Sequence, residues 1–308
     1  MELVILGFNS AIPTKRTSPT AQLLISNDRH FLIDCGEGTQ VQIRKSKTGF
    51  SKINHIFISH LHGDHVFGLI GLISSFSLLG RDTPLNIYAP KGIKELINTQ
   101  LKLTHSWGNF ALNFVELTSE KSELIYEDSK IEVHTIPLKH RIYANGFLFS
   151  EKTKLRKLDI EKIRQYPEIE ICDYRNLKAG KDFIGQDGKV IENHLLTLTP
   201  EHSYSYAFCS DTMYDVDIVP IIKNADVLYH EATFLDEMKE LAFKTGHSTA
   251  LQAAQIAKKA EVKYLILGHF SNRYEDISVF KTEADTVFPN TILPEELIKI
   301  DFKKLDRI

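Results

Sequence analysis

Residues 60–65 place three histidines and one aspartate within six positions, in the order HLHGDH. Residues 53–59 before them are apolar and β-branched, as in a buried strand, and residues 66–79 after them form an apolar stretch long enough for a helix. The four polar side chains therefore belong to a strand-to-helix loop, which can direct several of them at one point. One tetrahedral zinc that also keeps a water needs fewer ligands than this run offers. The run predicts two metals side by side.

Paired metals favour one kind of chemistry. Two ions about 3.5–4 Å apart can activate a shared water and stabilise both oxygens of a phosphoryl displacement. The alternatives are a surface cluster of histidines and a single structural zinc. A structural zinc site more often contains cysteine, and residues 60–65 contain none.

The run resembles the H-x-H-x-D-H signature of the metallo-β-lactamase superfamily. Three later residues, His140, Asp211 and His269, each follow an apolar, strand-like segment and resemble further ligands of that superfamily. Side chains that follow strands gather at one edge of an open sheet, where such sites are built. The resemblance implies that Asp211 bridges the two metals. The set implied for the first metal is completed by His60, His62 and His140. The set implied for the second metal is completed by Asp64, His65 and His269.

Two shorter motifs point to one family within this superfamily. HEATF at residues 230–234 and HST at residues 247–249 are similar to motifs of ribonuclease Z, a tRNA 3′-processing endonuclease. The resemblance implies that Glu231 orients His247, and an imidazole of pKa near 6.5 can donate a proton at neutral pH. Ser248 and Thr249, at the start of a helix, are expected to contact phosphate. Asp64 is expected to help transfer a proton while it ligates a metal.

Three basic residues are candidates for contacts with RNA. Arg273 follows His269 closely and resembles an arginine of the family, and a guanidinium suits phosphate. Lys15 and Arg16 lie in the segment PTKRTSP, where the family has a loop that meets the acceptor end of tRNA. A basic surface turn without a role is the alternative for that segment.

The segment of residues 151–198 is far more polar than the strands on either side of it. It contains ten basic and nine acidic residues between Glu151 and Glu192, and it lies between the expected ligands His140 and Asp211. Ribonuclease Z carries a substrate-binding arm at this place in its fold. Residues 158–162 and 187–191 resemble parts of that arm. We expect the segment to bind RNA. The alternative is a solvent-exposed insertion with no function.

The pattern of apolar residues predicts an α/β protein. Strands are expected at residues 2–7, 21–26, 30–35, 53–59, 85–89, 112–117, 131–138, 205–209, 227–230 and 264–267. Helices are expected at residues 38–47, 66–79, 93–103, 215–223, 248–260 and 275–284. Sheets of this size must pack on each other and be covered by helices. The superfamily resemblance implies a four-layer αββα sandwich, a single domain over residues 1–308 with an inserted arm at about 151–198.

Composition indicates the cellular compartment and the kind of partner to expect. Of the 308 residues, 43% are hydrophobic, and the formal net charge of −3 gives no global basic field for nucleic acid. Three scattered cysteines argue against a disulfide framework and for a reducing compartment. The longest apolar stretch is too short to cross a membrane, and the first residues read as a strand and not a signal peptide. We expect a soluble, cytoplasmic protein, and the family resemblance implies a homodimer.

These observations lead to one expected function and two alternatives. The expected function is removal of the 3′ trailer from precursor tRNA by a zinc-dependent endoribonuclease with two Zn²⁺ per chain, although the ligands also suit Mn²⁺ or Fe²⁺. The first alternative is another hydrolase on the same scaffold, such as a cyclic-nucleotide phosphodiesterase or an arylsulfatase-like enzyme. The second is a non-catalytic nucleic-acid-binding protein, which the complete set of ligands disfavours.

Overall fold

The computed structural model describes residues 1–15 and 17–305. Arg16, one of the residues expected to contact RNA, lies outside the described residues. The chain forms two compact units. The larger unit comprises Met1–Ser150 and Tyr204–Ile308, and the smaller comprises Glu151–Ser203.

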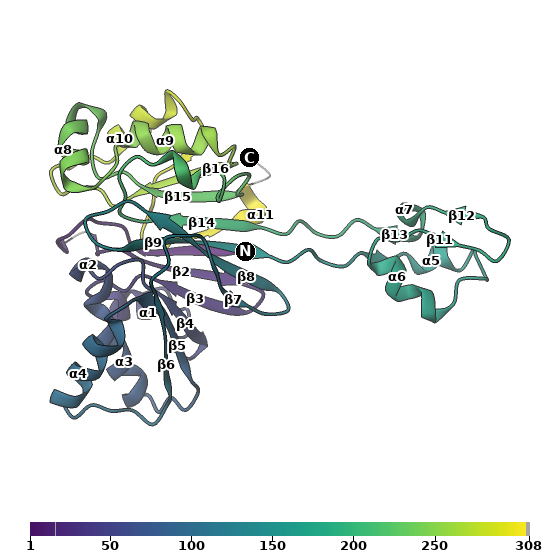
Figure 1. Ribbon diagram of the computed structural model, residues 1–308, viewed down its shortest axis with the longest axis horizontal. Helices are drawn as coiled ribbons and strands as arrows, with labels where there is room; N and C mark the ends of the chain where they lie inside the picture. Colours follow the sequence, from purple (N-terminus) through teal and green to yellow (C-terminus); the bar gives the residue numbers. More distant parts are fainter. Residues whose placement is uncertain (16, 306–308) are drawn as a thin grey trace. The chain divides into compact units, whose positions relative to one another are not determined.

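Two seven-stranded sheets form the centre of the larger unit (Figure 1). The first sheet has, in spatial order, the strands β18 (Lys299–Asp301), β1 (Glu2–Gly7), β2 (Ala21–Ser26), β3 (Arg29–Ile33), β4 (Ile53–Phe57), β5 (Leu85–Pro90) and β6 (Leu112–Leu117). The second sheet has, in spatial order, the strands β17 (Thr291–Ile292), β16 (Tyr264–Gly268), β15 (Val227–Glu231), β14 (Ser205–Cys209), β9 (Ala144–Glu151), β8 (Ile131–Leu138) and β7 (Leu124–Glu127).

Helices flank the two sheets (Figure 1). Those associated with the first sheet are α1 (Thr39–Lys45), α2 (Gly63–Val66), α3 (Gly68–Leu78) and α4 (Ile93–Leu103), with the 3₁₀ turn η1 (Phe50–Lys52). Those in the second half of the chain are α8 (Lys239–Thr245), α9 (Ala250–Lys259), α10 (Ser278–Asp285) and α11 (Phe302–Leu305), with the 3₁₀ turns η3 (Val216–Ile218) and η4 (Asp236–Met238).

Alternation along the strands explains why four layers form. In β1, Leu3 and Ile5 belong to the core between the two sheets, whereas Val4 and Leu6 pack with the helices on the outer face. Successive side chains of a strand point to opposite faces, so a strand that is apolar at every position must be covered on both sides. Burial of both faces of each sheet holds the loops at the strand ends in place.

The smaller unit has its own small core of six buried hydrophobic residues, Ile163, Ile169, Leu177, Phe183, Ile191 and Leu196. Two short two-stranded sheets frame it, β10 (Lys157–Leu158) with β13 (Thr197–Leu198) and β11 (Phe183–Ile184) with β12 (Val190–Ile191). Its helices are α5 (Ile160–Ile163), α6 (Tyr174–Lys178) and α7 (Asn193–Leu196), with the 3₁₀ turn η2 (Ile171–Asp173).

Some expected elements differ from the observed ones. The helix expected at residues 215–223 is wrong, because only the short turn η3 forms and Pro220 cannot continue a helix. The helix expected at 66–79 forms as α3, which begins two residues later than expected, and the short helix α2 precedes it. The sequence pattern missed β9, in which Asn145 and Gly146 follow the first residue and suggest a turn. Gly146 is needed there, since a Cβ would collide with the carbonyl oxygen of Phe208 on the neighbouring strand.

The described helices are all too short, or not apolar enough, to span a lipid bilayer.

Candidate metal centre

The expected metal ligands all lie just beyond the ends of strands. His60 and His62 follow β4, and Asp64 and His65 lie in the short helix α2 that comes next. His140 follows β8 in the second sheet. The remaining two ligands, Asp211 and His269, follow β14 and β16 of that sheet. The packed sheets thus bring residues more than 200 positions apart to one place.

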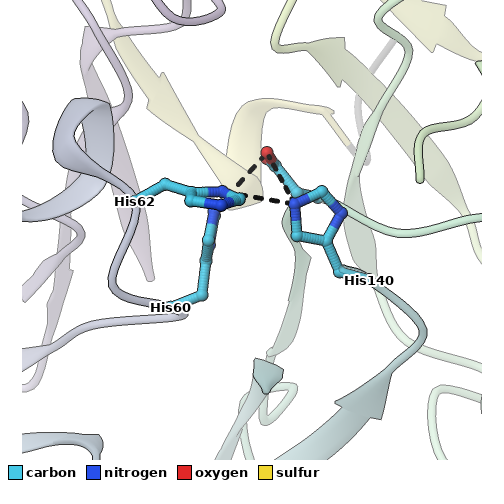
Figure 2. A group of neighbouring side chains, drawn as sticks. His60, His62 and His140 are labelled. Atoms are coloured by element: carbon cyan, nitrogen blue, oxygen red, sulfur yellow. Dashed lines mark hydrogen bonds and ion pairs between the residues drawn. The ribbon is translucent and has the colours of Figure 1, made fainter. Parts of the chain in front are cut away.

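Four of these residues form a first group of possible ligands, shown in part in Figure 2. The ligand atoms of His60, His62, His140 and Asp211 lie within 4.8 Å of one another. His60 Nε2 is 3.5 Å from Asp211 Oδ2, and His140 Nε2 is 3.9 Å from the same oxygen. His60 and His62 come from one loop, and His140 approaches them from the other sheet (Figure 2).

A second group comprises Asp64, His65 and His269, again with ligand atoms within 4.8 Å of one another. Asp64 Oδ2 is 3.5 Å from His65 Nε2 and 3.6 Å from His269 Nε2. Asp211 Oδ1 faces this group, at 3.4 Å from His65 Nε2 and 3.2 Å from His269 Nε2. The two oxygens of Asp211 therefore face different groups, which is the arrangement that a bridging carboxylate requires.

The state of His60 tests whether these residues suit a metal. Its side chain is fully buried, Nδ1 contacts Ser59 Oγ at 3.0 Å, and Nε2 has no hydrogen-bond partner among the described residues. Burial lowers the pKa of His60 well below its usual value, so the ring is neutral. A neutral imidazole with a free nitrogen directed at a carboxylate is the form that binds a metal. The histidine and carboxylate groups could hold metal ions, and zinc, manganese and iron all suit such ligands.

Asp34 supports the second group, and no sequence motif predicted it. Its carboxylate accepts hydrogen bonds from His65 Nδ1 at 2.7 Å, from Ser59 N at 2.7 Å and from Ser59 Oγ at 2.9 Å. A carboxylate on the far nitrogen fixes the orientation and tautomer of a ligating histidine. Asp34 has a left-handed backbone with φ of 56°, a conformation that Asp and Asn adopt more readily than most residues. Its position after a strand, like that of the ligands, is the signal that could have revealed it.

Thr233 plays the corresponding part for His269. Its hydroxyl lies 2.9 Å from His269 Nδ1 and donates to Glu231 Oε2 at 2.8 Å. His269 itself has φ of 59°, and its N–H donates to the carbonyl oxygen of Phe8 at 2.7 Å. A non-glycine residue in this conformation is held there by its surroundings. Thr233 is part of the HEATF motif, but its contact with His269 became visible only in the structure.

Glu231 and His247 form a hydrogen-bonded pair beside the two groups. Glu231 is fully buried and accepts from His247 Nδ1 at 2.9 Å, while the backbone N–H groups of Thr212, Thr233 and Ser248 donate to it at 3.1, 2.9 and 3.0 Å. Burial alone would lower the pKa of His247, but the charge of Glu231 and this hydrogen bond raise it to about 9. His247 therefore carries a proton on Nδ1, which it donates in the hydrogen bond to Glu231. The ring of His247 stacks on that of His269, with 5.3 Å between the ring centroids.

Of the residues expected to contact phosphate or RNA that the structure describes, two are buried and two are exposed. Ser248 is buried, and its hydroxyl donates to the carbonyl oxygen of Thr212 at 2.7 Å. Thr249 is buried and caps helix α9, accepting from Gln252 N at 3.2 Å. Both hydroxyls therefore already have protein partners, and their contact with phosphate stays a prediction. Arg273 and Lys15 are exposed on loops, and their contacts with RNA also stay predictions.

The N-terminal loop that contains Lys15 reaches the metal centre. The N–H of Ala11 donates to Asp64 Oδ2 at 2.8 Å, the same oxygen that faces His65 and His269, and so helps to orient this carboxylate. Asn272 donates to the carbonyl oxygen of Ile12 at 3.2 Å, so this loop and the loop of Arg273 lie side by side. A substrate held by either loop would thus lie next to Asp64.

Similar proteins show to which family this chain belongs. A ribonuclease Z from Bacteroides thetaiotaomicron is 48% identical over 295 residues, which cover 96% of this chain and 93% of that protein. The chain belongs to the ribonuclease Z family. A ribonuclease Z from Cytophaga hutchinsonii is 46% identical, with 96% of this chain and 94% of that protein covered. The family expected from the sequence is thereby confirmed.

Solved structures agree with the family. The crystal structure of human tRNase Z, short form, superposes with a TM-score of 0.70 at 28% identity, covering 98% of this chain and 99% of that one. The metallo-β-lactamase fold protein YhfI from Bacillus subtilis shares the fold at 17% identity, with a TM-score of 0.68 and coverage of 97% and 98%. The expected αββα fold class is confirmed.

A family model described as Anti-Pycsar protein Apyc1 also matches, over residues 1–162, so that half of the chain belongs to this family as well. The match includes the segment HLHGDH and His140. It ends before Asp211, Glu231, His247 and His269. The ribonuclease Z relatives, in contrast, match across both halves of the centre.

Proposed function

We propose that this ribonuclease Z family member removes the 3′ trailer from precursor tRNA, and that it does so with two metal ions. The observation that carries the proposal is the position of Asp211, whose two oxygens face two separate groups of histidines. The pair of Glu231 and His247 adds a proton donor on the same side of the centre. Ligand groups of this kind beside a positioned acid suit hydrolysis of a phosphodiester.

The residues that would hold the metals follow from the two groups. His60, His62, His140 and Asp211 would hold one ion, and Asp64, His65, His269 and the other oxygen of Asp211 would hold the second. When bound, two zinc ions, or two ions of manganese or iron, would lower the pKa of an attacking water and offset charge on the phosphoryl oxygens. The support from the structure is the buried, unpaired nitrogen of His60 and the shared carboxylate.

Two residues would handle protons during the reaction. His247, oriented through Nδ1 by Glu231, would donate a proton from Nε2 to the departing 3′ oxygen, which leaves a 3′-hydroxyl on the tRNA and a 5′-phosphate on the trailer. Asp64 would help accept the proton of the attacking water, since Ala11 occupies only one of its oxygens. Arg273 would bind a phosphoryl oxygen, and Lys15 and Arg16 would contact the acceptor end of the tRNA.

The inserted segment would supply binding energy for the rest of the tRNA. Arg164, Lys178, Lys181 and Lys189 are all exposed in the smaller unit and can contact phosphates. We take the chain to be one metallo-β-lactamase-like domain with a substrate-binding insertion at about residues 151–198. The family resemblance supports a homodimer in the cytoplasm as the working form, which light scattering on the purified protein would test.

One assay tests the proposed function. A labelled precursor tRNA and the chromogenic ester bis(p-nitrophenyl) phosphate would be incubated with the protein, with and without a metal chelator. The proposal requires chelator-sensitive cleavage of the precursor at the end of the acceptor stem. Turnover of the small ester without cleavage of the precursor would instead favour a phosphodiesterase for small molecules.

A further inference from the structure

Arg141 follows the expected ligand His140 directly, in the loop between β8 and β9, and is exposed. Its aliphatic stem lies against Gly246, where a Cβ would be 3.4 Å from Arg141 Cγ and 2.9 Å from His140 Nδ1. Gly246 ends helix α8 with φ of 80°, and its carbonyl oxygen accepts from His140 Nδ1 at 2.7 Å. The contact with Gly246 holds the start of the Arg141 side chain next to His247.

The guanidinium of Arg141 makes no hydrogen bond or ion pair with any residue in the parts of the chain that the structure describes. Arg273 shares this property among the described residues, whereas Arg29 and Arg81 do not. Arg29 pairs with Asp128, and Arg81 donates to the side chain of Asn54 at 2.7 Å. Arg44 lies over the ring of Phe50, 5.2 Å from its centroid. Arg141 therefore keeps all of its donors free for a ligand.

The position of Arg141 puts its charge beside the centre. It follows His140 directly, and its stem lies against Gly246, the residue that precedes His247.

The carboxylates nearest to His140 and His247 already have other partners. Glu231 is buried and already accepts from His247 and from three backbone N–H groups, and both oxygens of Asp211 face histidines. An unpaired guanidinium at this place is stabilised when an anion lies against it. The fork of N–H donors on arginine matches phosphate oxygens in a bidentate manner.

We propose that Arg141 binds a non-bridging oxygen of the scissile phosphodiester, on the side of the centre formed by His62 and His140. The inference rests on the proposed function for its natural substrate, RNA, but the ligand that it requires is only the phosphodiester group. Arg141 and Arg273, which follow ligands of different groups, then contact the same phosphate from two sides. Arg141 is a substrate-binding residue for the reaction and does not act through the metals.

The test compares Arg141→Gln and Arg141→Lys with the unchanged protein, and uses Lys102→Gln as the matched control. Lys102 is an exposed cation in helix α4, so its loss removes one surface charge outside the centre. Rates of cleavage are measured on precursor tRNA and on bis(p-nitrophenyl) phosphate. Binding of inorganic phosphate to the metal-loaded protein is measured by calorimetry, and bound metal by elemental analysis.

A charge-assisted hydrogen bond to phosphate contributes about a ten- to hundredfold factor. Arg141→Gln should therefore lower kcat/KM by about that factor on both substrates and weaken phosphate binding similarly, with metal content unchanged. Arg141→Lys should recover part of the loss, and Lys102→Gln should behave like the unchanged protein.

Three results would overturn the inference: equal activity in Arg141→Gln, a loss confined to precursor tRNA, or a loss of metal that accounts for the loss of activity. Failure of the unchanged protein to cleave precursor tRNA would refute the proposed function alone, because the ester and phosphate measurements still test Arg141.

Discussion

The metal centre and the inserted unit Glu151–Ser203 are built in opposite ways. In the centre, the single side chain of Glu231 accepts hydrogen bonds from four residues, all of them buried: His247, Thr233, Thr212 and Ser248. The inserted unit packs only six buried hydrophobic residues and turns most of its charged side chains to solvent. The first arrangement holds its side chains through several hydrogen bonds each, and the second presents a charged surface.

This contrast implies a division of labour that experiments can separate. Groups that act on the reacting bond must be positioned tightly, because a small displacement costs much of the rate. Groups that bind a polyanion through many weak phosphate contacts need only be numerous and charged. Changes in the centre should thus affect every phosphodiester substrate. Changes in the inserted unit should affect only RNA.

The largest effect is expected for Asp211→Ala. Because Asp211 faces both groups of ligands, its loss should lower bound zinc well below two per chain and reduce cleavage of both substrates below detection. Elemental analysis and the two rate assays measure this. Asp82→Ala, which removes an exposed carboxylate on a surface loop, is the control. Full zinc occupancy in Asp211→Ala would show that this carboxylate does not bridge the ions.

The next effect is expected for His247→Ala, and it depends on the leaving group. A general acid contributes about 10²–10⁴-fold when the departing oxygen needs a proton. Cleavage of precursor tRNA, which expels a ribose 3′ oxygen, should fall by about that factor. Hydrolysis of bis(p-nitrophenyl) phosphate should fall much less, since p-nitrophenolate leaves without protonation. Equal losses on the two substrates at unchanged metal content would contradict the role of His247 as an acid.

A third experiment removes the inserted unit. Strands β9 and β14 are antiparallel neighbours with Ser150 opposite Ser205, so residues 152–203 can be replaced by a two-residue Asn-Gly turn. Binding of precursor tRNA should weaken, and the slope of log affinity against log salt should fall by about one for each phosphate that the shortened protein no longer binds. Ester hydrolysis and zinc content should stay the same. Unchanged tRNA affinity and salt slope would show that the segment has no part in binding RNA.

The sequence predicted the central part of the fold because local patterns determine it. Strands such as β1, β2, β6 and β8 have the predicted bounds, because each is a run rich in apolar residues that ends near polar or turn-forming residues. The helix expected at residues 215–223 failed because an apolar periodicity was read through Pro220. Strand β9 was missed because Asn145 and Gly146, near its start, are typical turn residues.

The candidate site was predictable where residues form a motif and hidden where they do not. The residues that the structure brings together in the two groups were expected from the run at residues 60–65 and from the strand-like segments that precede the other three. Asp34 and Thr233, in contrast, act on His65 and His269 across 31 and 36 positions of sequence. No spacing rule connects such pairs, because the packing of the strands brings them together. The unpaired state of Arg141 is equally a property of the folded chain.

The smallest effect tests one of these hidden contacts, through Asp34→Asn. The substitution keeps the size of the side chain and its tolerance of the left-handed backbone, but it removes the charge that faces His65 Nδ1. Loss of such a supporting carboxylate lowers metal affinity by about 10–100-fold. Competition with a chelator measures the affinity, and excess zinc should restore cleavage of both substrates. Asp28→Asn is the matched control, since Asp28 also has a positive φ, of 65°, but lies in the exposed turn between β2 and β3. If Asp34→Asn held zinc as tightly as this control, orientation of His65 would rest on packing alone.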